Sequence, residues 1–269
     1  MRVAVVGHVE WVEFARVERV PAPGEIVQAE AWWGEAAGGG GVASVLLARL
    51  AGASTLFTAL GRDELGEASQ EQLTSMGVRV EAARHPEPQR RGFTFVDNSG
   101  ERTITILGEK HIPRRSDPLP WEELTHADGV YFVSGDAGAA RAARSARVLV
   151  ATARSLAVLA EAGVELDALV RSSSDPSEVY ERGDLEPQPR LVVATSGSEG
   201  GTWRTAACRA GTYEPVPPPG PIVDAYGAGD SFAAGLTYAL AQGDEVEAAL
   251  AFAAECGASA LTRRGAHGS

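Results

Sequence analysis

The sequence of 269 residues predicts an α/β fold built on a doubly wound, mostly parallel sheet. Three observations carry this prediction: short runs of β-branched residues, helix-forming segments between them, and two extended stretches that interrupt the alternation. The short runs lack polar alternation, which is typical of strands buried on both faces of a parallel sheet. The expected strands are Val3–Gly7, Thr55–Leu60, Gly129–Val133, Val148–Thr152 and Leu191–Thr195.

Segments rich in Ala, Leu, Glu and Arg lie between the expected strands and have helical spacing. Two of them stop at a glycine, Gly77 and Gly163, as helices commonly do. Asp244 and Glu247 resemble a capping box that opens the last helix. The expected helices contain Val45–Leu50, Glu64–Met76, Leu156–Ala162, the repeat Phe232, Leu236 and Leu240, and a final segment that ends at Ala260.

Two stretches, about 10–33 and 91–106, do not follow the alternation of strands and helices. Pro21–Gly24 marks a turn in the first, and Asp97–Gly100 is a strong hairpin turn in the second. Because an isolated two-stranded hairpin is marginally stable in water, we expect the two stretches to pair in one small β-sheet, called the lid below. The chain 1–269 is expected to be a single domain into which the lid segments are inserted.

Composition and charge exclude several classes of protein. A formal net charge of −12 argues against sequence-independent nucleic-acid binding, which needs Lys and Arg against phosphates. No apolar run approaches the ~18 residues of a membrane span, and the opening run is too short for a signal peptide. Two cysteines cannot build a disulfide framework, so we expect a cytoplasmic protein. The positive charge is nearly all arginine, and Lys110 is the only lysine.

The strongest functional signal is the segment Asp224–Phe232, in which a loop of small residues leads directly into a helix. Glycines let the backbone approach a ligand closely, and the free N–H groups at a helix start favour an anion. Asp230 lies at this start, where a carboxylate can accept the proton of an attacking hydroxyl. The simpler alternative is an ordinary loop with Asp230 as a helix cap. The segment lacks the Lys-Ser/Thr pair of a P-loop.

The segment Asp224–Phe232 resembles the C-terminal signature of the PfkB-type, ribokinase-like carbohydrate kinases. Further segments resemble features of that family in the same order: Pro23–Glu25, Gly38–Gly41, Gly61–Gly66, Thr195–Gly200 and Thr262–Ala266. The similarity covers nearly the whole chain. It implies a ribokinase-like three-layer α/β/α fold with a mostly parallel central sheet and a small β lid.

The resemblance also implies a reaction, the ATP-dependent phosphorylation of a hydroxyl on a sugar or related small molecule, with Mg²⁺. In that reaction Asp230 is the general base. The backbone of Gly227, Ala228 and Gly229 forms the hole for developing negative charge. The residues implied in nucleotide binding are Thr195, Gly197, Gly200 and Gly257.

The chain departs from the family pattern near the expected metal site. The family commonly has Asn-x-x-Glu late in the domain, and Ser172 and Asp175 occupy those places here. Asp175 is therefore the candidate metal residue, acting on Mg²⁺ through water. Ala225 stands where the family often has Thr, which leaves activation by a monovalent cation open.

The residues expected to bind the sugar depart further from the family pattern. Val12 stands where the family usually has an Asp that holds sugar hydroxyls, and Glu10 and Glu13 are candidate replacements. The implied acceptor-binding residues are Glu10, Val12, Gly38, Gly39, Gly40 and Ala43. We expect Trp11, Val12 and Glu13 to point toward the acceptor, and specificity to shift away from ribose. Arg90 and Arg91 are available to an anionic substrate, although a solvated pair is the simpler interpretation.

Other interpretations stay open at this point. A catalytically weak nucleotide- or sugar-binding protein, with a regulatory role on a kinase scaffold, is the main alternative. A dinucleotide-dependent oxidoreductase is supported only by Val3–Gly7 as a first strand. The open edge of the lid is a surface through which two copies can form a homodimer. The five histidines show no spacing typical of a metal site and are expected on the surface or in loops.

Overall fold

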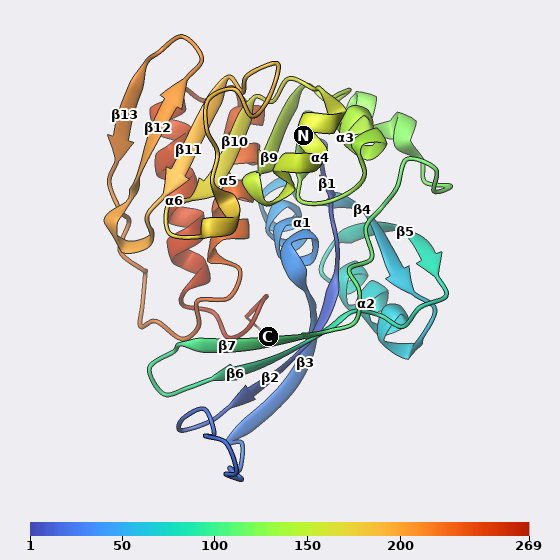
Figure 1. Ribbon diagram of the computed structural model, residues 1–269, viewed down its shortest axis with the longest axis vertical. Helices are drawn as coiled ribbons and strands as arrows, with labels where there is room; N and C mark the ends of the chain where they lie inside the picture. Colours follow the sequence, from blue (N-terminus) through green and yellow to red (C-terminus); the bar gives the residue numbers. More distant parts are fainter. Residues whose placement is uncertain (269) are drawn as a thin grey trace.

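The computed structural model describes residues 1–268 and contains a nine-stranded and a four-stranded sheet (Figure 1). The large sheet has the order β13-β12-β11-β10-β9-β8-β1-β4-β5, and its strands run parallel from β5 to β11. Only β12 and β13 are antiparallel to their neighbours. Its strands are β1 (Val3–Val6), β4 (Ser54–Gly61), β5 (Val78–His85), β8 (Gly129–Phe132), β9 (Val148–Thr152), β10 (Ala168–Ser172), β11 (Leu191–Thr195), β12 (Gly201–Thr205) and β13 (Ala210–Tyr213).

Helices cover both faces of the large sheet, so the fold has three layers. The apolar cluster on one face includes residues of α1, α2, α5 and α6, and the cluster on the other includes residues of α3 and α4. The α-helices are α1 (Gly38–Ala51), α2 (Glu64–Ser75), α3 (Ala137–Ala143), α4 (Leu156–Ala162), α5 (Ala228–Gln242) and α6 (Val246–Ala260). Four short 3₁₀ segments complete the set: η1 (Trp121–His126), η2 (Ala153–Ser155), η3 (Pro176–Glu178) and η4 (Gly197–Glu199). Within residues 1–268, no helix has both the length and the apolar character needed to cross a membrane.

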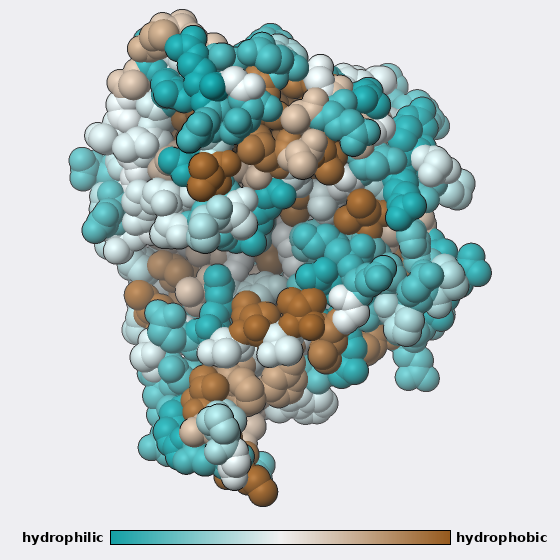
Figure 2. Space-filling model, in the orientation of Figure 1, coloured by the Kyte–Doolittle hydropathy of each residue, from teal (hydrophilic) through white to brown (hydrophobic). Residues whose placement is uncertain are grey.

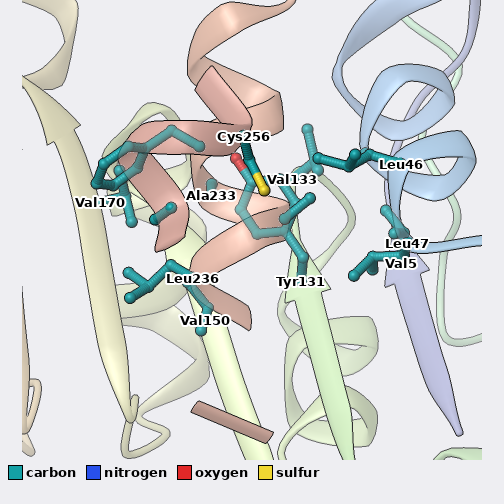
Figure 3. Close-up of a cluster of buried hydrophobic side chains, with 14 of the residues drawn as sticks. Val5, Leu46, Leu47, Tyr131, Val133, Val150, Val170, Ala233, Leu236 and Cys256 are labelled. Atoms are coloured by element: carbon teal, nitrogen blue, oxygen red, sulfur yellow. The ribbon is translucent and has the colours of Figure 1, made fainter. Parts of the chain in front are cut away.

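Small residues let the helices approach the sheet and one another closely. Figure 3 shows Leu46 and Leu47 of α1 beside Val5 of β1, in the same buried cluster as Tyr131 and Leu236. A Cβ placed on Gly235 of α5 would lie 2.8 Å from the Sγ of Cys256 on α6. The contact between α5 and α6 therefore depends on a glycine at this point.

The two expected lid segments pair in one four-stranded sheet of order β3-β2-β6-β7. The strands are β2 (Glu10–Arg16), β3 (Ala31–Ala37), β6 (Arg91–Val96) and β7 (Arg102–Leu107). The two segments join where β2 runs parallel to β6, with Val12 opposite Gly92. Figure 1 shows this sheet extending away from the large sheet at the end where α1 begins.

The structure adds elements that the sequence did not reveal. All five expected strands are present, but β5, β10, β12 and β13 were not expected. β5 carries charged residues and alanines at a sheet edge, and the other three are only four or five residues long. The last helix begins at Val246 without a side-chain cap, so the expected capping box is absent.

Two of the five histidines lie in loops, as expected, but are buried rather than at the surface. His111 and His267 are buried, and each binds a backbone carbonyl: His111 that of Pro88 and His267 that of Ala36. These hydrogen bonds explain why an ionisable side chain is tolerated inside the fold.

Two of the connections between the lid and the large sheet are residues 86–90, after β5, and residues 108–120, after β7. Gln89 fixes the first of them and is buried. Its side chain accepts a hydrogen bond from the Gly61 N–H at 3.0 Å and donates one to the Val9 carbonyl at 2.8 Å. Its own N–H donates to Asp63 Oδ2 at 3.0 Å. One side chain therefore ties the lid connection to β4 and to the loop after β1.

Replacing Gln89 with Ala is expected to lower the free energy of unfolding by about 2–4 kcal/mol, because the N–H of Gly61 and the carbonyl of Val9 would both lose a buried partner. Chemical denaturation measures the change. Gln28→Ala is the matched control, since Gln28 is exposed. Equal stability of the two variants would contradict the anchoring role of Gln89.

Candidate active site

The segment predicted to bind an anion forms the start of α5. Gly227 precedes the helix with φ 75°, and a Cβ there would lie 2.8 Å from Val42 Cγ1, so the position requires glycine. The helix begins at Ala228 and Asp230 lies in its first turn. A Cβ on Gly229 would have no heavy atom within 4 Å, and Gly229 is exposed. The N–H groups at this helix start therefore border open space, where an anionic ligand can approach them.

The glycine run at the start of α1 lies against the start of α5. A Cβ on Gly39 would lie 2.8 Å from Asp230 Oδ1, so only glycine allows this approach. The N–H of Gly40 donates to the His8 carbonyl at 3.0 Å. The N–H of Gly38 donates to the Tyr226 hydroxyl at 3.2 Å. The run thus brings the start of a second helix beside the carboxylate of Asp230.

Asp230 has the acid–base properties of a general base. Burial raises its pKa from 3.8 to about 6. The Arg154 charge opposes this shift and the Glu178 charge adds to it, while Arg102 and the Tyr131 hydroxyl lower the pKa. A pKa near 6 leaves the carboxylate mostly ionised at neutral pH but more basic than an exposed Asp.

Arg154 organises the carboxylates beside Asp230. Its Nη2 donates to Asp175 Oδ2 at 2.5 Å, and its Nε donates to Glu178 Oε1 at 2.6 Å. Glu178 is buried, and its other oxygen accepts from the N–H of Ser172 at 2.6 Å. The charge of Glu178, rather than that of Asp175, acts on Asp230. The sequence analysis missed both residues: Arg154 lies outside the family motifs, whereas Glu178 stands three residues after Asp175, the spacing of Asn-x-x-Glu, and could have been found from it.

Asp175, the residue expected to act on a metal, is fully engaged in structural contacts. Its Oδ1 accepts from the N–H and the hydroxyl of Ser177, and its Oδ2 is held by Arg154. These bonds cap η3. Glu178 is held in the same way, since Arg154 and the N–H of Ser172 occupy both of its oxygens.

The lid contacts the loop that leads into α5. Arg102 of β7 donates to the Ala225 carbonyl at 2.5 Å and lies 5.6 Å from the centre of the Tyr226 ring. Tyr226 in turn meets Phe14 of β2 edge to face, with ring centres 5.3 Å apart. The Asp224 carboxylate fixes the loop by accepting hydrogen bonds from the N–H groups of Tyr226 and Gly265. The lid is therefore positioned over the anion-binding segment.

Side chains alternate between the two faces of the lid, and the face with Arg102 contacts the α5 loop. Register places Val12, Ile104 and Ile106 on this same face. Ile104 and Ile106 are 40% and 41% exposed, and Figure 2 shows hydrophobic residues gathered over β6 and β7. The lid therefore presents an apolar wall there.

Two expected acceptor residues offer nothing to a sugar hydroxyl. Val12 is buried among Phe14, Ala37 and Val42, and Ala43 is fully buried in the main core. Trp11 and Glu13 lie on the opposite face of the lid from Val12, where Glu13 pairs with Arg91 at 2.6 Å. Alternation of side chains along β2 explains this outcome, since neighbours of an inward residue point outward.

A group of charged residues lies beside the acceptor side of the site. Glu10 Oε1 lies 2.7 Å from Arg90 Nε and 3.7 Å from His8 Nε2. Burial and the charges of Lys110, Arg90 and Arg154 lower the pKa of His8 to about 3, so its imidazole is neutral. Burial and the charges of Arg90 and Arg154 also lower the pKa of Lys110, while Glu10 and Asp230 oppose this.

The residues expected to bind nucleotide surround the ends of β11 and α5. Thr195 ends β11, and Gly197 opens η4 with φ 57°. A Cβ on Gly200 would lie 2.2 Å from the Tyr213 carbonyl oxygen, so Gly200 is needed for chain packing. A Cβ on Gly257 of α6 would lie 3.3 Å from the Ala228 carbonyl oxygen. Gly257 therefore lies directly against the start of α5.

The family model of the pfkB carbohydrate kinases matches residues 1–181 and 146–269 of this chain. The chain belongs to the pfkB family of carbohydrate kinases. An ATP-dependent ribose-1-phosphate kinase of Halopiger xanaduensis is 32% identical, with 99% of this chain and 94% of the relative covered. The chain is thus a sugar kinase, a phosphotransferase that uses ATP.

Solved structures share the fold of this kinase. A putative ribokinase from Agrobacterium tumefaciens matches with a TM-score of 0.82 and 22% identity, over 99% of this chain and 93% of that one. A ribokinase from Thermotoga maritima matches with a TM-score of 0.79 and 20% identity, over 99% and 95%. The ribokinase-like fold expected from the sequence is therefore confirmed.

Gly229 gives a direct test of the anion-binding segment. Gly229→Ala is expected to raise the free energy of unfolding by about 0.5–1 kcal/mol, because Ala is the better helix former and meets no neighbour. Turnover is expected to fall at least tenfold, because the new methyl group occupies space beside the helix N–H groups. Thermal unfolding and a steady-state kinase assay measure the two effects.

Gly220→Ala is the matched control, since its Cβ would meet only Thr262 Cγ2, at 3.8 Å. A Gly229→Ala enzyme with the wild-type rate would show that no reacting group approaches this helix start.

Proposed function

We propose that this kinase transfers the γ-phosphoryl group of ATP to a hydroxyl of a sugar that already carries a phosphate group, with Asp230 as general base. The assignment of the base rests on the position and pKa of Asp230. The assignment of a phosphorylated acceptor rests on Lys110, which carries an unneutralised charge at the acceptor side.

In the proposed step the Asp230 carboxylate accepts the proton of the acceptor hydroxyl. The hydroxyl oxygen forms a bond to the γ-phosphorus, and the bond from that phosphorus to the bridging oxygen of ADP breaks. The N–H groups at the Gly227–Gly229 helix start stabilise the charge on the transferring phosphoryl oxygens. Thr195, Gly197, Gly200 and Gly257 border the same region and support the nucleotide.

The residues beside Asp230 fit a magnesium ion. Glu178 supplies a buried carboxylate whose charge acts on Asp230, and oxygen ligands of this kind suit Mg²⁺ held partly through water. When bound, the ion neutralises phosphate charge. Arg154 keeps the Glu178 side chain in place.

Lys110 carries the argument for an anionic acceptor. Within residues 1–268 its ammonium forms no ion pair with a carboxylate, whereas Arg90 is paired with Glu10 and Arg154 with Asp175 and Glu178. Although Lys110 is an exposed residue, partial desolvation of its ammonium and the charges of Arg90 and Arg154 lower its pKa, so its cationic form is less favourable than that of a lysine in water. A phosphate dianion bound there would remove this penalty and add charge-assisted hydrogen bonds.

Two further observations support a phosphorylated sugar. Val12 supplies no carboxylate for sugar hydroxyls, and Glu10 is held by Arg90, so binding energy has to come from another part of the substrate. The relative from Halopiger xanaduensis, similar over 99% of this chain, is described as a ribose-1-phosphate kinase. Ribose 1-phosphate is therefore the first acceptor to test.

We also infer a homodimer formed through the lid. β7 is an edge strand of the lid sheet, and all six of its residues are exposed. An exposed edge strand of this length presents unpaired N–H and carbonyl groups to a second copy. Leu107, on the face opposite Ile106, is 46% exposed.

Asp230→Asn is expected to lower turnover by ~10²–10⁴-fold, because the amide cannot accept the hydroxyl proton. The wild-type rate is expected to fall as the pH drops through about 6, where Asp230 becomes protonated. A variant with near wild-type kcat on the true acceptor would contradict the base assignment.

The same variant should also affect stability in a pH-dependent way. The pKa of Asp230 is higher in the folded state than in the unfolded state, so ionisation of Asp230 destabilises the fold as the pH rises from about 4 to 6. Asp230→Asn removes that cost and should be about 1–3 kcal/mol more stable than wild type at pH 7, but similar at pH 4.

Lys110→Gln tests the acceptor. The KM for ribose 1-phosphate is expected to rise about 10–100-fold, the effect of losing charge-assisted hydrogen bonds, while the KM for ATP and the rate with unphosphorylated ribose stay unchanged. Arg209→Gln is the control, since Arg209 pairs with Glu247 at the exposed surface. An equal loss of activity with ribose 1-phosphate and with unphosphorylated ribose would overturn the assignment of a phosphorylated acceptor. Absence of turnover with every sugar and nucleoside tested would instead favour a binding protein.

A further inference from the structure

We propose that His85, Glu87 and His111 form a binding site for a divalent transition metal of the zinc class. Each of the three side chains offers one ligand atom, and these atoms lie within 4.8 Å of one another. His85 ends β5, Glu87 lies in the first lid connection and His111 lies in the second. The site therefore joins three segments at the base of the lid, and it is independent of the proposed reaction.

His111 is oriented as a metal ligand. It is buried, and its Nε2 lies 2.8 Å from the Pro88 carbonyl oxygen. A carbonyl accepts only from a protonated nitrogen, so Nδ1 carries the free lone pair. A histidine that binds zinc through one nitrogen commonly donates its other N–H to a carbonyl or carboxylate in this way. Pro88 thus supplies the supporting contact that fixes the ring.

The other two ligands are held close by the same segments. The rings of His85 and His111 have centroids 5.3 Å apart and are tilted by 50°, so they approach without stacking. The carbonyl of His85 accepts from the Arg62 N–H at 2.9 Å, which anchors the end of β5. Gln89 fixes the connection that carries Glu87. Small side-chain rotations are enough to bring three ligand atoms to one ion.

The donor set selects the metal. Two imidazoles and one carboxylate suit Zn²⁺, which takes three protein ligands and a water in tetrahedral geometry. Co²⁺ and Ni²⁺ accept the same donors, whereas Mg²⁺ prefers oxygen ligands in octahedral geometry. The site is therefore distinct in chemistry from the magnesium site beside Glu178.

A bound ion would cross-link two of the connections through which the lid is attached. Residues 86–90 lead into β6 and residues 108–113 follow β7, so an ion held by Glu87 and His111 restricts movement of one connection relative to the other. Arg90 and Lys110, the neighbours of Gln89 and His111, belong to the acceptor side of the site. The metal thus sets the position of the segments that carry both residues.

The experiment is a titration of the full chain with Zn²⁺ against a chromophoric chelator, without nucleotide and with excess Mg²⁺. One Zn²⁺ per chain is expected, and His85→Ala and Glu87→Gln should each weaken binding at least tenfold. Glu87 is exposed and the change to Gln is isosteric, so this variant keeps the fold. His126→Ala, which removes an exposed histidine outside the site, should bind as wild type does.

Two further measurements decide the proposal. Co²⁺ should give the intense visible absorption of a four-coordinate ion, and Zn²⁺ should slow hydrogen exchange in residues 86–90 and 108–113 of the wild type but not of Glu87→Gln. Zinc binding that is unchanged in the double variant of His85→Ala and Glu87→Gln would overturn the site. Weak absorption typical of six-coordinate cobalt, or displacement of Zn²⁺ by Mg²⁺, would overturn it as well.

Discussion

The close approach of α1 and α5 is the constraint on which the site depends. The starts of both helices reach the Asp230 carboxylate, and Gly39 permits this because any side chain there would overlap Asp230 Oδ1. The same approach partly buries Asp230, and desolvation raises its pKa to about 6. One packing requirement therefore produces both the shape of the loop that leads into α5 and the raised basicity of Asp230, the proposed general base.

The charged residues around Asp230 act on one another's pKa values and do not form isolated pairs. Arg154 holds Glu178 and Asp175 and lowers the Asp230 pKa, which limits the rise caused by burial. Lys110 feels Arg90 and Arg154 on one side and Glu10 and Asp230 on the other. Since Arg90 and Lys110 lie in two of the lid connections, a change in the position of these connections alters the electrostatic field at Asp230.

The sequence predicted what local patterns and the family motif encode. The buried strands, the glycine loop at Asp230 and the pairing of the two lid segments follow from periodicity, turn residues and resemblance. The directions of the side chains in β2 were predicted wrongly. Val12 and Glu13 were both expected to point toward the acceptor, but as neighbours in a strand they lie on opposite faces. Arg154, Glu178 and Lys110 were missed as well. Arg154 and Lys110 act on Asp230 only through the tertiary fold, which no spacing along the chain records, whereas Glu178 follows Asp175 at the spacing of Asn-x-x-Glu.

The loss of a carboxylate at Val12 changes how a substrate can be held. A sugar hydroxyl needs a polar partner, but Val12 is buried, and Ile104 and Ile106 are exposed on the lid face that contacts the α5 loop. An apolar wall excludes water from the reacting centre without fixing the orientation of a sugar ring. In the proposed reaction, the orientation of the sugar comes from the residues beside this wall, where Lys110 and Arg90 lie in two of the lid connections. A charged group on the acceptor, held at the rim while a hydroxyl reaches Asp230, satisfies both requirements at once.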